Sequence, residues 1–204
     1  MRQLIDFFCT PYTHATAFQI TLEIVAVFFG IVSVLYAKKE NIRVFPTGIV
    51  STVLYVYICY QFTLYGDMVI NLYYTLMSFY GWYVWNHKPL GQSIEITTSN
   101  SLDMLKAFGV FISTAAFVVG VYLYYDRFDR VTDYFDTFTS GIFFAGMWLM
   151  AHKKIEHWMF WILGNLISIP LYFVKGLGFS GSQFTIFLIL AVQGYIEWKK
   201  HLNK

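Results

Sequence analysis

Long apolar runs alternate with short polar breaks along almost the whole chain of 204 residues. A run of about 20 apolar residues is long enough to cross a bilayer as a helix. None of the breaks between the runs is long enough to hold a soluble domain. The pattern predicts an all-α polytopic membrane protein with seven transmembrane helices, at residues 18–37, 44–63, 67–86, 104–125, 135–151, 157–174 and 182–198.

The composition supports this assignment. Hydrophobic residues make up 57% of the chain, aromatic residues 21% and charged residues 13%, with a mean hydropathy of +0.54. A soluble domain of this length would be far more polar. Residues 1–17 are expected to form a short amphipathic segment rather than a cleavable signal peptide. The two cysteines, Cys9 and Cys59, support neither a disulfide framework nor a metal site.

The sequence gives no sign of catalysis, and we expect a protein that is not an enzyme and carries no cofactor. It contains no nucleophile elbow, phosphate loop, pair of catalytic carboxylates or zinc signature. All histidines fall near predicted helix ends, and no pair within a helix has metal-ligand spacing. They are His14, His87, His152, His157 and His201.

Basic residues divide unevenly between the two sides of the predicted bundle. Ten of the fourteen fall on the side of the C-terminus: Lys38, Lys39, Arg43, Lys88, Lys106, Lys153, Lys154, Lys199, Lys200 and Lys204. The other side holds Arg2, Arg127, Arg130 and Lys175. Because Lys and Arg accumulate in cytoplasmic loops, the bias predicts an outside N-terminus and a cytoplasmic C-terminus.

The chain also contains a weak internal repeat. The segments Phe79–Trp85 and Val192–Trp198 share an aromatic pattern around Gly81 and Gly194, which lie 113 positions apart. Other landmarks keep nearly this offset: Glu23 with Asp136 at 113, Ser51 with Asn165 at 114, and Lys38 and Lys39 with Lys153 and Lys154 at 115.

This offset predicts two three-helix repeats of the same orientation, at 18–86 and 135–198, joined by a linking helix at 104–125 within one transmembrane domain, 1–204. In transporters built from such parallel repeats, the solute site lies near the middle of the bilayer between the halves.

The sixth predicted helix carries the clearest candidate site. Trp158, Trp161 and Asn165 follow each other at three and four residues, so they project from one helical face. An amide in hydrocarbon must pair with a neighbouring helix or with a solute. Hydrogen bonding between helices and an interfacial tryptophan belt remain alternatives for these residues.

Further polar and aromatic residues could face the same solute. Asn71 and Tyr74 lie at i and i+3 on the third predicted helix, and Gln193 lies on the seventh. Neutral amides suit a carboxamide or ribose hydroxyls, and aromatic rings suit a flat or cationic ring. Interhelical bonding is the alternative here too. Glu23 and Asp136 lie within about two turns of their outer helix ends, which argues against proton coupling.

These residues carry a resemblance to the PnuC transporters of bacterial vitamin uptake. The shared signatures are Leu64-Tyr65 followed by Tyr80-Gly81-Trp82-Tyr83-x-Trp85, and Trp158-x-x-Trp161-x-x-x-Asn165. The resemblance implies a fold similar to SWEET sugar transporters, a homotrimer, an inner-membrane location and facilitated diffusion of an unphosphorylated vitamin that a cytoplasmic kinase then traps. It implies that Trp161 and Asn165 contact the substrate. Asn71 stands where relatives often carry a glutamine.

The resemblance and the residues together favour nicotinamide riboside, which links the protein to NAD biosynthesis. Its flat cationic ring, carboxamide and ribose match aromatic rings and amides. Thiamine fits nearly as well, and riboflavin or deoxynucleosides are further alternatives within the family. A structural membrane protein without a solute path is the alternative outside it. A phosphorylated substrate fits poorly, because no Lys or Arg lies at the predicted site.

Overall fold

The computed structural model describes residues 16–61, 65–87, 95–124, 131–174 and 178–202. The predicted N-terminal segment lies outside this part up to residue 15, as does Leu64 of the third-helix signature. Several other residues considered above also lie outside it: Arg2, Cys9, His14, Lys88, Arg127, Arg130, Lys175 and Lys204.

Seven helices lie within the described residues, in agreement with the predicted number. They are α2 (Ala17–Lys38), α3 (Val44–Gln61), α4 (Tyr65–Asn86), α5 (Ser101–Tyr124), α6 (Val131–Ala151), α7 (His157–Val174) and α8 (Gly178–Leu202). By length and composition alone, α2, α3, α5 and α7 are apolar enough to cross a membrane. The helices α4, α6 and α8 are long enough, at 22, 21 and 25 residues, but are less apolar.

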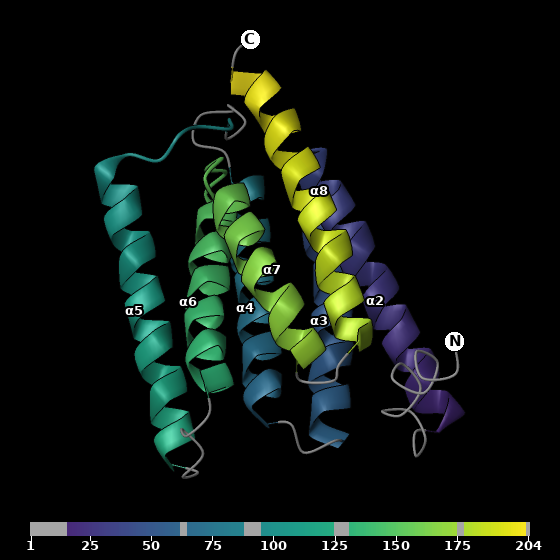
Figure 1. Ribbon diagram of the computed structural model, residues 1–204. Coiled ribbons are helices and arrows are strands. Elements are labelled where there is room, and N and C mark those ends of the chain that lie inside the picture. Colours follow the sequence, from purple (N-terminus) through teal and green to yellow (C-terminus); the bar gives the residue numbers. More distant parts are fainter. Residues whose placement is uncertain (1–15, 62–64, 88–94, 125–130, 175–177, 203–204) are drawn as a thin grey trace.

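The helices of each predicted repeat pack side by side. In the first repeat α3 lies between α2 and α4, and in the second α7 lies between α6 and α8. The repeats meet where α2 contacts α8 and where α4 contacts α6. These contacts close six helices into a ring, and α5 packs on α6 at its outside (Figure 1). The ring confirms the predicted architecture of two three-helix halves and a linking helix.

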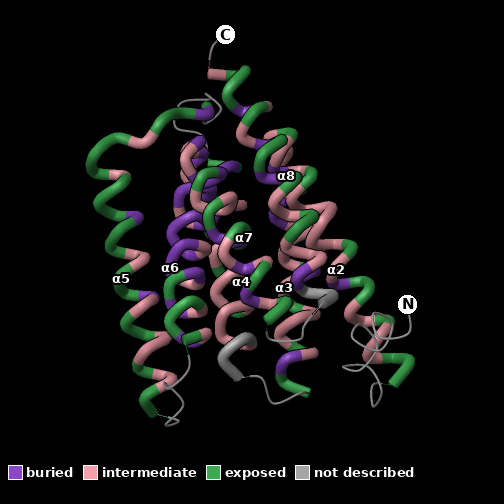
Figure 2. Tube along the Cα trace, in the orientation of Figure 1, coloured by how far each residue is buried: buried purple, intermediate pink, exposed green. Residues whose placement is uncertain are grey.

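Burial follows this arrangement, as Figure 2 shows. Helix α6 touches α4, α5 and α7, and twelve of its 21 residues are buried. Helices α2 and α5 have only two buried residues each. Because α6 is enclosed by protein, it can carry polar residues that a lipid-facing helix would exclude.

Each repeat has a turn between its first two helices: the first turn is at 39–43 and the second at 152–156. The backbone hydrogen bonds of these turns show the internal symmetry. In the first turn, Glu40 N–H donates to Ala37 O and Asn41 N–H to Tyr36 O. In the second, Lys153 N–H donates to Met150 O and Lys154 N–H to Leu149 O. Each bond of the first turn recurs 113 residues later, which supports the predicted offset between Gly81 and Gly194.

This register corrects two of the sequence matches. At an offset of 113, Glu40 rather than Lys38 or Lys39 is the counterpart of Lys153, and Thr52 rather than Ser51 is the counterpart of Asn165. The sequence comparison aligned lysine with lysine and polar side chain with polar side chain. The backbone of the turns shows that the charges at equivalent positions are opposite.

The two turns lie at the same end of the bundle as segment 95–100 and the C-terminal end of α8 (Figure 1). We call this the basic end, because the described turns hold Lys39, Arg43, Lys153 and Lys154. A hydrophobic cluster lies beneath it. Phe45 packs on Gly81 in the first repeat, and Trp158 packs on Gly194 in the second.

Candidate functional site

Asn165 lies on the buried face of α7, as the spacing predicted. Its side chain is 3% exposed, and Trp158, Gly164 and Ser168 share this face. In the part of the chain that the structure describes, none of the side-chain hydrogen bonds involves Asn165. A buried amide without such a bond is costly unless something else pairs with it. An amide at this position can pair with a polar group that enters the ring of helices.

Trp161 lies one turn from Asn165, toward the basic end. It is half-buried, and its ring lies against α6 at Gly146, where a Cβ would be 2.7 Å from ring atoms Cδ1 and Nε1. Its ring centroid lies 5.4 Å from that of Trp158 and 5.0 Å from that of His157, both edge to face. Glycine at position 146 thus lets an indole fill the space between α6 and α7.

Trp158 lies beside Trp161, closer to the basic end. It is fully buried and packs against Gly194 of α8. Its ring meets Trp198 edge to face at 5.8 Å. The sequence placed Trp158 and Trp161 on one face but could not separate their surroundings, which depend on which neighbouring helix holds a glycine.

Helix α4 contributes aromatic side chains from the first repeat. Tyr74 packs on the same hydrophobic cluster as Trp161, and its ring meets Phe144 of α6 at 5.6 Å. Tyr73 stacks on Phe144 at 3.7 Å and donates a hydrogen bond to its carbonyl oxygen. Asn71 is half-buried one turn away along α4. The structure therefore brings Tyr74 and Trp161 to one cluster, with contributions from both repeats.

Gln193, another candidate, and Ser51, the residue matched to Asn165 in the sequence repeat, take part in hydrogen bonds between helices. Gln193 is exposed, and its side-chain oxygen accepts a hydrogen bond of 2.8 Å from Lys38 Nζ. Ser51 is buried and donates to the carbonyl oxygen of Ala26. These contacts match the alternative of interhelical bonding. The structure does not place either side chain beside Asn165.

The acidic residues lie near helix ends, as predicted. Glu23 lies in the second turn of α2 and Asp136 in the second turn of α6. Both are half-buried, and Tyr122 of α5 donates a hydrogen bond of 3.4 Å to Asp136. These acids lie at the end of the bundle opposite to the basic end, away from Trp161.

Sequence reasoning missed two polar features of the interior. Ser168 is 1% exposed and lies one turn beyond Asn165, a position that the i+3 spacing could have indicated. The hydroxyl of Tyr55 on α3 hydrogen-bonds to Gln183 on α8. The contact between Tyr55 and Gln183 joins the two repeats in the half of the bundle away from the basic end, and it could not be found without the tertiary structure.

The charge of the interior also limits what it can bind. The described residues of α3, α4, α6 and α7 include no Lys or Arg. Two surface pockets lie away from Asn165. One of about 490 Å³ is at the basic end beside Glu156 and Lys199, and one of about 320 Å³ lies between α4, α5 and α6. Neither Trp161 nor Asn165 lines either of these two pockets.

Known proteins similar to this chain are transporters. The family model described as nicotinamide mononucleotide transporter matches residues 20–200. The nicotinamide riboside transporter PnuC of Neisseria mucosa is 30% identical over 193 residues, which cover 88% of this chain and 72% of the relative. The riboflavin/roseoflavin transporter RibM of Streptomyces davaonensis is 28% identical over 127 residues, covering 60% and 58%.

A solved structure supports the fold. The crystal structure of the vitamin B3 transporter PnuC superposes with a TM-score of 0.70 at 23% identity, covering 98% of this chain and 89% of that one. The likeness extends over all seven described helices, and several of these are apolar enough to cross a membrane. The family model, the relatives and this shared fold agree: the chain belongs to the nicotinamide mononucleotide transporter family, as a multi-pass, PnuC-like membrane transporter without enzymatic activity.

Proposed function

We propose that this protein carries nicotinamide riboside across the membrane by facilitated diffusion. The observation that carries the proposal is the buried amide of Asn165, which takes part in none of the described side-chain hydrogen bonds. The substrate carboxamide would pair with this amide. Its cationic pyridinium ring would stack against Trp161, because indole attracts a cation to its face.

The ribose would contact neutral groups from both repeats. Asn71 and Tyr74 of α4 offer an amide and a hydroxyl, and Ser168 of α7 offers a second hydroxyl beyond Asn165. Trp158 would hold Trp161 in place from the side of the basic end. Gln193 would act through its bond to Lys38, at the basic end of the path rather than at the ring of the substrate.

The absence of Lys and Arg from the described residues of α3, α4, α6 and α7 favours a nucleoside over a nucleotide. A buried phosphate would need a cationic partner. We therefore expect isothermal titration of the purified protein to detect nicotinamide riboside and to detect no binding of nicotinamide mononucleotide at the same concentrations. Equal affinity for the two compounds would contradict the proposed site.

A second candidate substrate is a different flat-ringed vitamin. The similarity to a relative named for riboflavin and roseoflavin favours this alternative, and thiamine has the same flat cationic character as nicotinamide riboside. Parallel titrations with riboflavin and thiamine would decide between the vitamins. A structural protein without a solute path would show no counterflow of any of them in proteoliposomes.

We infer passive transport, because the two membrane acids lie near the outer helix ends and away from Trp161. Glu23→Gln and Asp136→Asn are expected to leave uptake of labelled nicotinamide riboside into proteoliposomes near the wild-type rate. The measurement is repeated with and without a proton gradient. Loss of uptake in either variant, together with loss of its dependence on the gradient, would instead assign proton coupling.

The cellular setting follows from the same proposal. The basic end faces the cytoplasm of a bacterial inner membrane, because the described turns there concentrate Lys and Arg. Passive transport accumulates a vitamin only if the product is removed, so a cytoplasmic kinase that phosphorylates it would trap it inside. We further propose a homotrimer, which chemical crosslinking in membranes would test.

A further inference from the structure

Glu40 and Lys153 occupy equivalent positions in the two repeats, 113 residues apart. Both have a positive φ, 53° and 50°, which is rare for residues other than glycine. The same hydrogen bonds surround each of them in its turn. Because parallel repeats are related by an axis along the membrane normal, equivalent turns lie on opposite sides of that axis.

The two side chains meet across this axis. Lys153 Nζ lies 2.5 Å from Glu40 Oε1, and the side chains are 9% and 25% exposed. The ammonium group also lies 4.5 Å from the ring centroid of Trp85, on α4 of the first repeat. His201 Nδ1 of α8 is 4.0 Å from the second oxygen of Glu40. The ion pair is therefore a partly buried contact between the halves at the basic end.

We propose that Glu40 and Lys153 form the cytoplasmic gate of the transport path. The ion pair holds the repeats together above the hydrophobic cluster, and it must break for a solute beside Asn165 to leave at the basic end. This inference rests on the proposed transport function, because a gate has meaning only where a solute passes.

Other contacts at the basic end also cross between the repeats, and they would open with the gate. Trp198 Nε1 of α8 donates to Ala37 O of α2 at 2.9 Å. Lys38 of α2 donates to Gln193 of α8. Neither contact joins two oppositely charged residues at equivalent positions of the two repeats. The Glu40–Lys153 pair is thus the electrostatic part of a larger closed contact.

The closed end also contains groups that favour opening. Three buried N–H or ring nitrogen groups have no hydrogen-bond partner among the described residues: Trp85 Nε1, His157 Nε2 and Trp158 Nε1. Unpaired buried polar groups destabilise the conformation that buries them, and water would pair with them once the end opens. An ion pair opposed by such groups keeps two conformations close in free energy, as alternating access requires.

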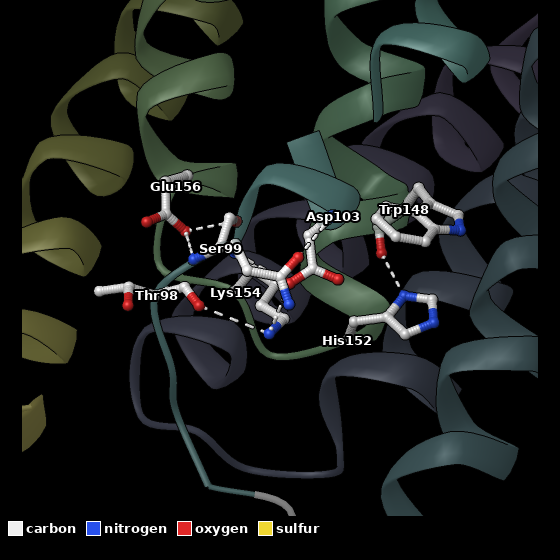
Figure 3. A network of polar contacts seen from close by, with 8 residues as sticks. Thr98, Ser99, Asp103, Trp148, His152, Lys154 and Glu156 are labelled. Carbon is white, nitrogen blue, oxygen red and sulfur yellow. Dashed lines mark hydrogen bonds and ion pairs between the residues drawn. The ribbon is translucent and has the colours of Figure 1, made fainter. Parts of the chain in front are cut away.

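The second turn is fixed to the linking helix, as Figure 3 shows. Thr97 exchanges backbone hydrogen bonds with Lys153 and Ile155. Ser99 donates to the Glu156 carboxylate through N–H and hydroxyl, at 2.9 and 2.6 Å. Lys154 pairs with Asp103 of α5 at 2.9 Å. Lys153 therefore belongs to a turn held by α5, and we expect Glu40 to move away with the first repeat.

The test measures the distance between the first turn and segment 95–100, which is hydrogen-bonded to the second turn. Spin labels are attached at Lys39→Cys and Thr98→Cys, both exposed positions, in a background without Cys9 and Cys59. Double electron–electron resonance spectroscopy in lipid nanodiscs then reports the distribution of distances between the two spin labels, without any transported solute. The wild-type pair is expected to give a main population at short distance.

Breaking the ion pair is expected to shift this distribution to longer distances. Glu40→Gln removes the attraction, and Glu40→Lys adds repulsion against Lys153, so the shift should be larger for the second variant. The double reversal Glu40→Lys with Lys153→Glu should restore the short population. Recovery in the double variant shows that the single variants fail at the gate and not in folding.

The matched control is Glu197→Gln, which breaks an ion pair of 3.0 Å with Lys200 within α8 alone and should leave the distribution unchanged. An unchanged distribution in both Glu40 variants, or no recovery in the double reversal, would overturn the gate. If the distances respond as expected but proteoliposomes take up no vitamin, the proposed function fails while the charge-dependent opening stands.

Discussion

Replacing Asn165 by alanine is expected to remove most of the binding of nicotinamide riboside while leaving the fold intact. The change deletes a buried amide that takes part in none of the described side-chain hydrogen bonds, so folding loses little. The substrate carboxamide would lose its partner, at a cost of about 1–3 kcal/mol, or roughly a 5- to 150-fold weaker Kd. Isothermal titration measures this loss.

Trp161→Ala should reduce binding to a similar extent, because it removes the ring that would face the cationic pyridinium in the proposed site. The control for both variants is Leu163→Ala on the same helix, whose side chain is 46% exposed and points away from the interior. Monodisperse elution in detergent shows that the fold persists. Near-normal affinity in Asn165→Ala and Trp161→Ala would exclude this site.

The second large effect is expected from Gly194→Ala, on stability rather than on binding. A Cβ at this position would lie 2.5 Å from ring atoms Cη2 and Cζ2 of Trp158. The indole is fully buried and cannot turn aside without displacing Trp161 and Trp198. Overpacking of this kind costs about 1–3 kcal/mol. Thermal unfolding in detergent, followed by tryptophan fluorescence, should show a clearly lower midpoint.

The matched control is Gly120→Ala on α5, where nothing lies within 4 Å of a new Cβ. Because alanine favours the helix over glycine by roughly 0.5–1 kcal/mol, this variant should unfold at the wild-type temperature or slightly above it. A Gly194→Ala variant as stable as the control would show that the Trp158 packing can relax.

The two predictions separate two roles that one helical face combines. Asn165 and Trp161 are expected to bind the substrate, whereas Trp158 and Gly194 are expected to stabilise the packing around Trp161. A substitution of Trp158 or Gly194 can weaken binding as well, but only together with a loss of stability. Comparing titration with unfolding for each variant therefore tells the roles apart.

Much of the architecture could be predicted from the sequence, because bilayer thickness fixes the length of an apolar run. The seven helices lie within a few residues of the predicted runs, and the offset of 113 between Gly81 and Gly194 recurs in the turns. The face of α7 that carries Trp158, Trp161 and Asn165 also followed from the helical period alone.

The contacts between helices could not be predicted in this way. Gln193 and Asn165 are both amides in apolar runs, yet the first is exposed and bonded to Lys38 and the second is buried. A period shows which residues share a face but not which neighbour that face meets. The offsets between matched residues, which ranged from 113 to 115 positions in the sequence, also did not show that Glu40 and Lys153 are equivalent.

Hydrophobic length and helical period are local properties, so the amino-acid sequence was enough to predict a membrane protein of two similar halves with an amide and indole face. The packing of the helices was needed to show what surrounds each tryptophan ring, and to show that opposite charges meet across the axis between the halves. Those properties depend on residues of different helices and turns, such as Gly194 with Trp158 and Glu40 with Lys153, and no local pattern records such pairings.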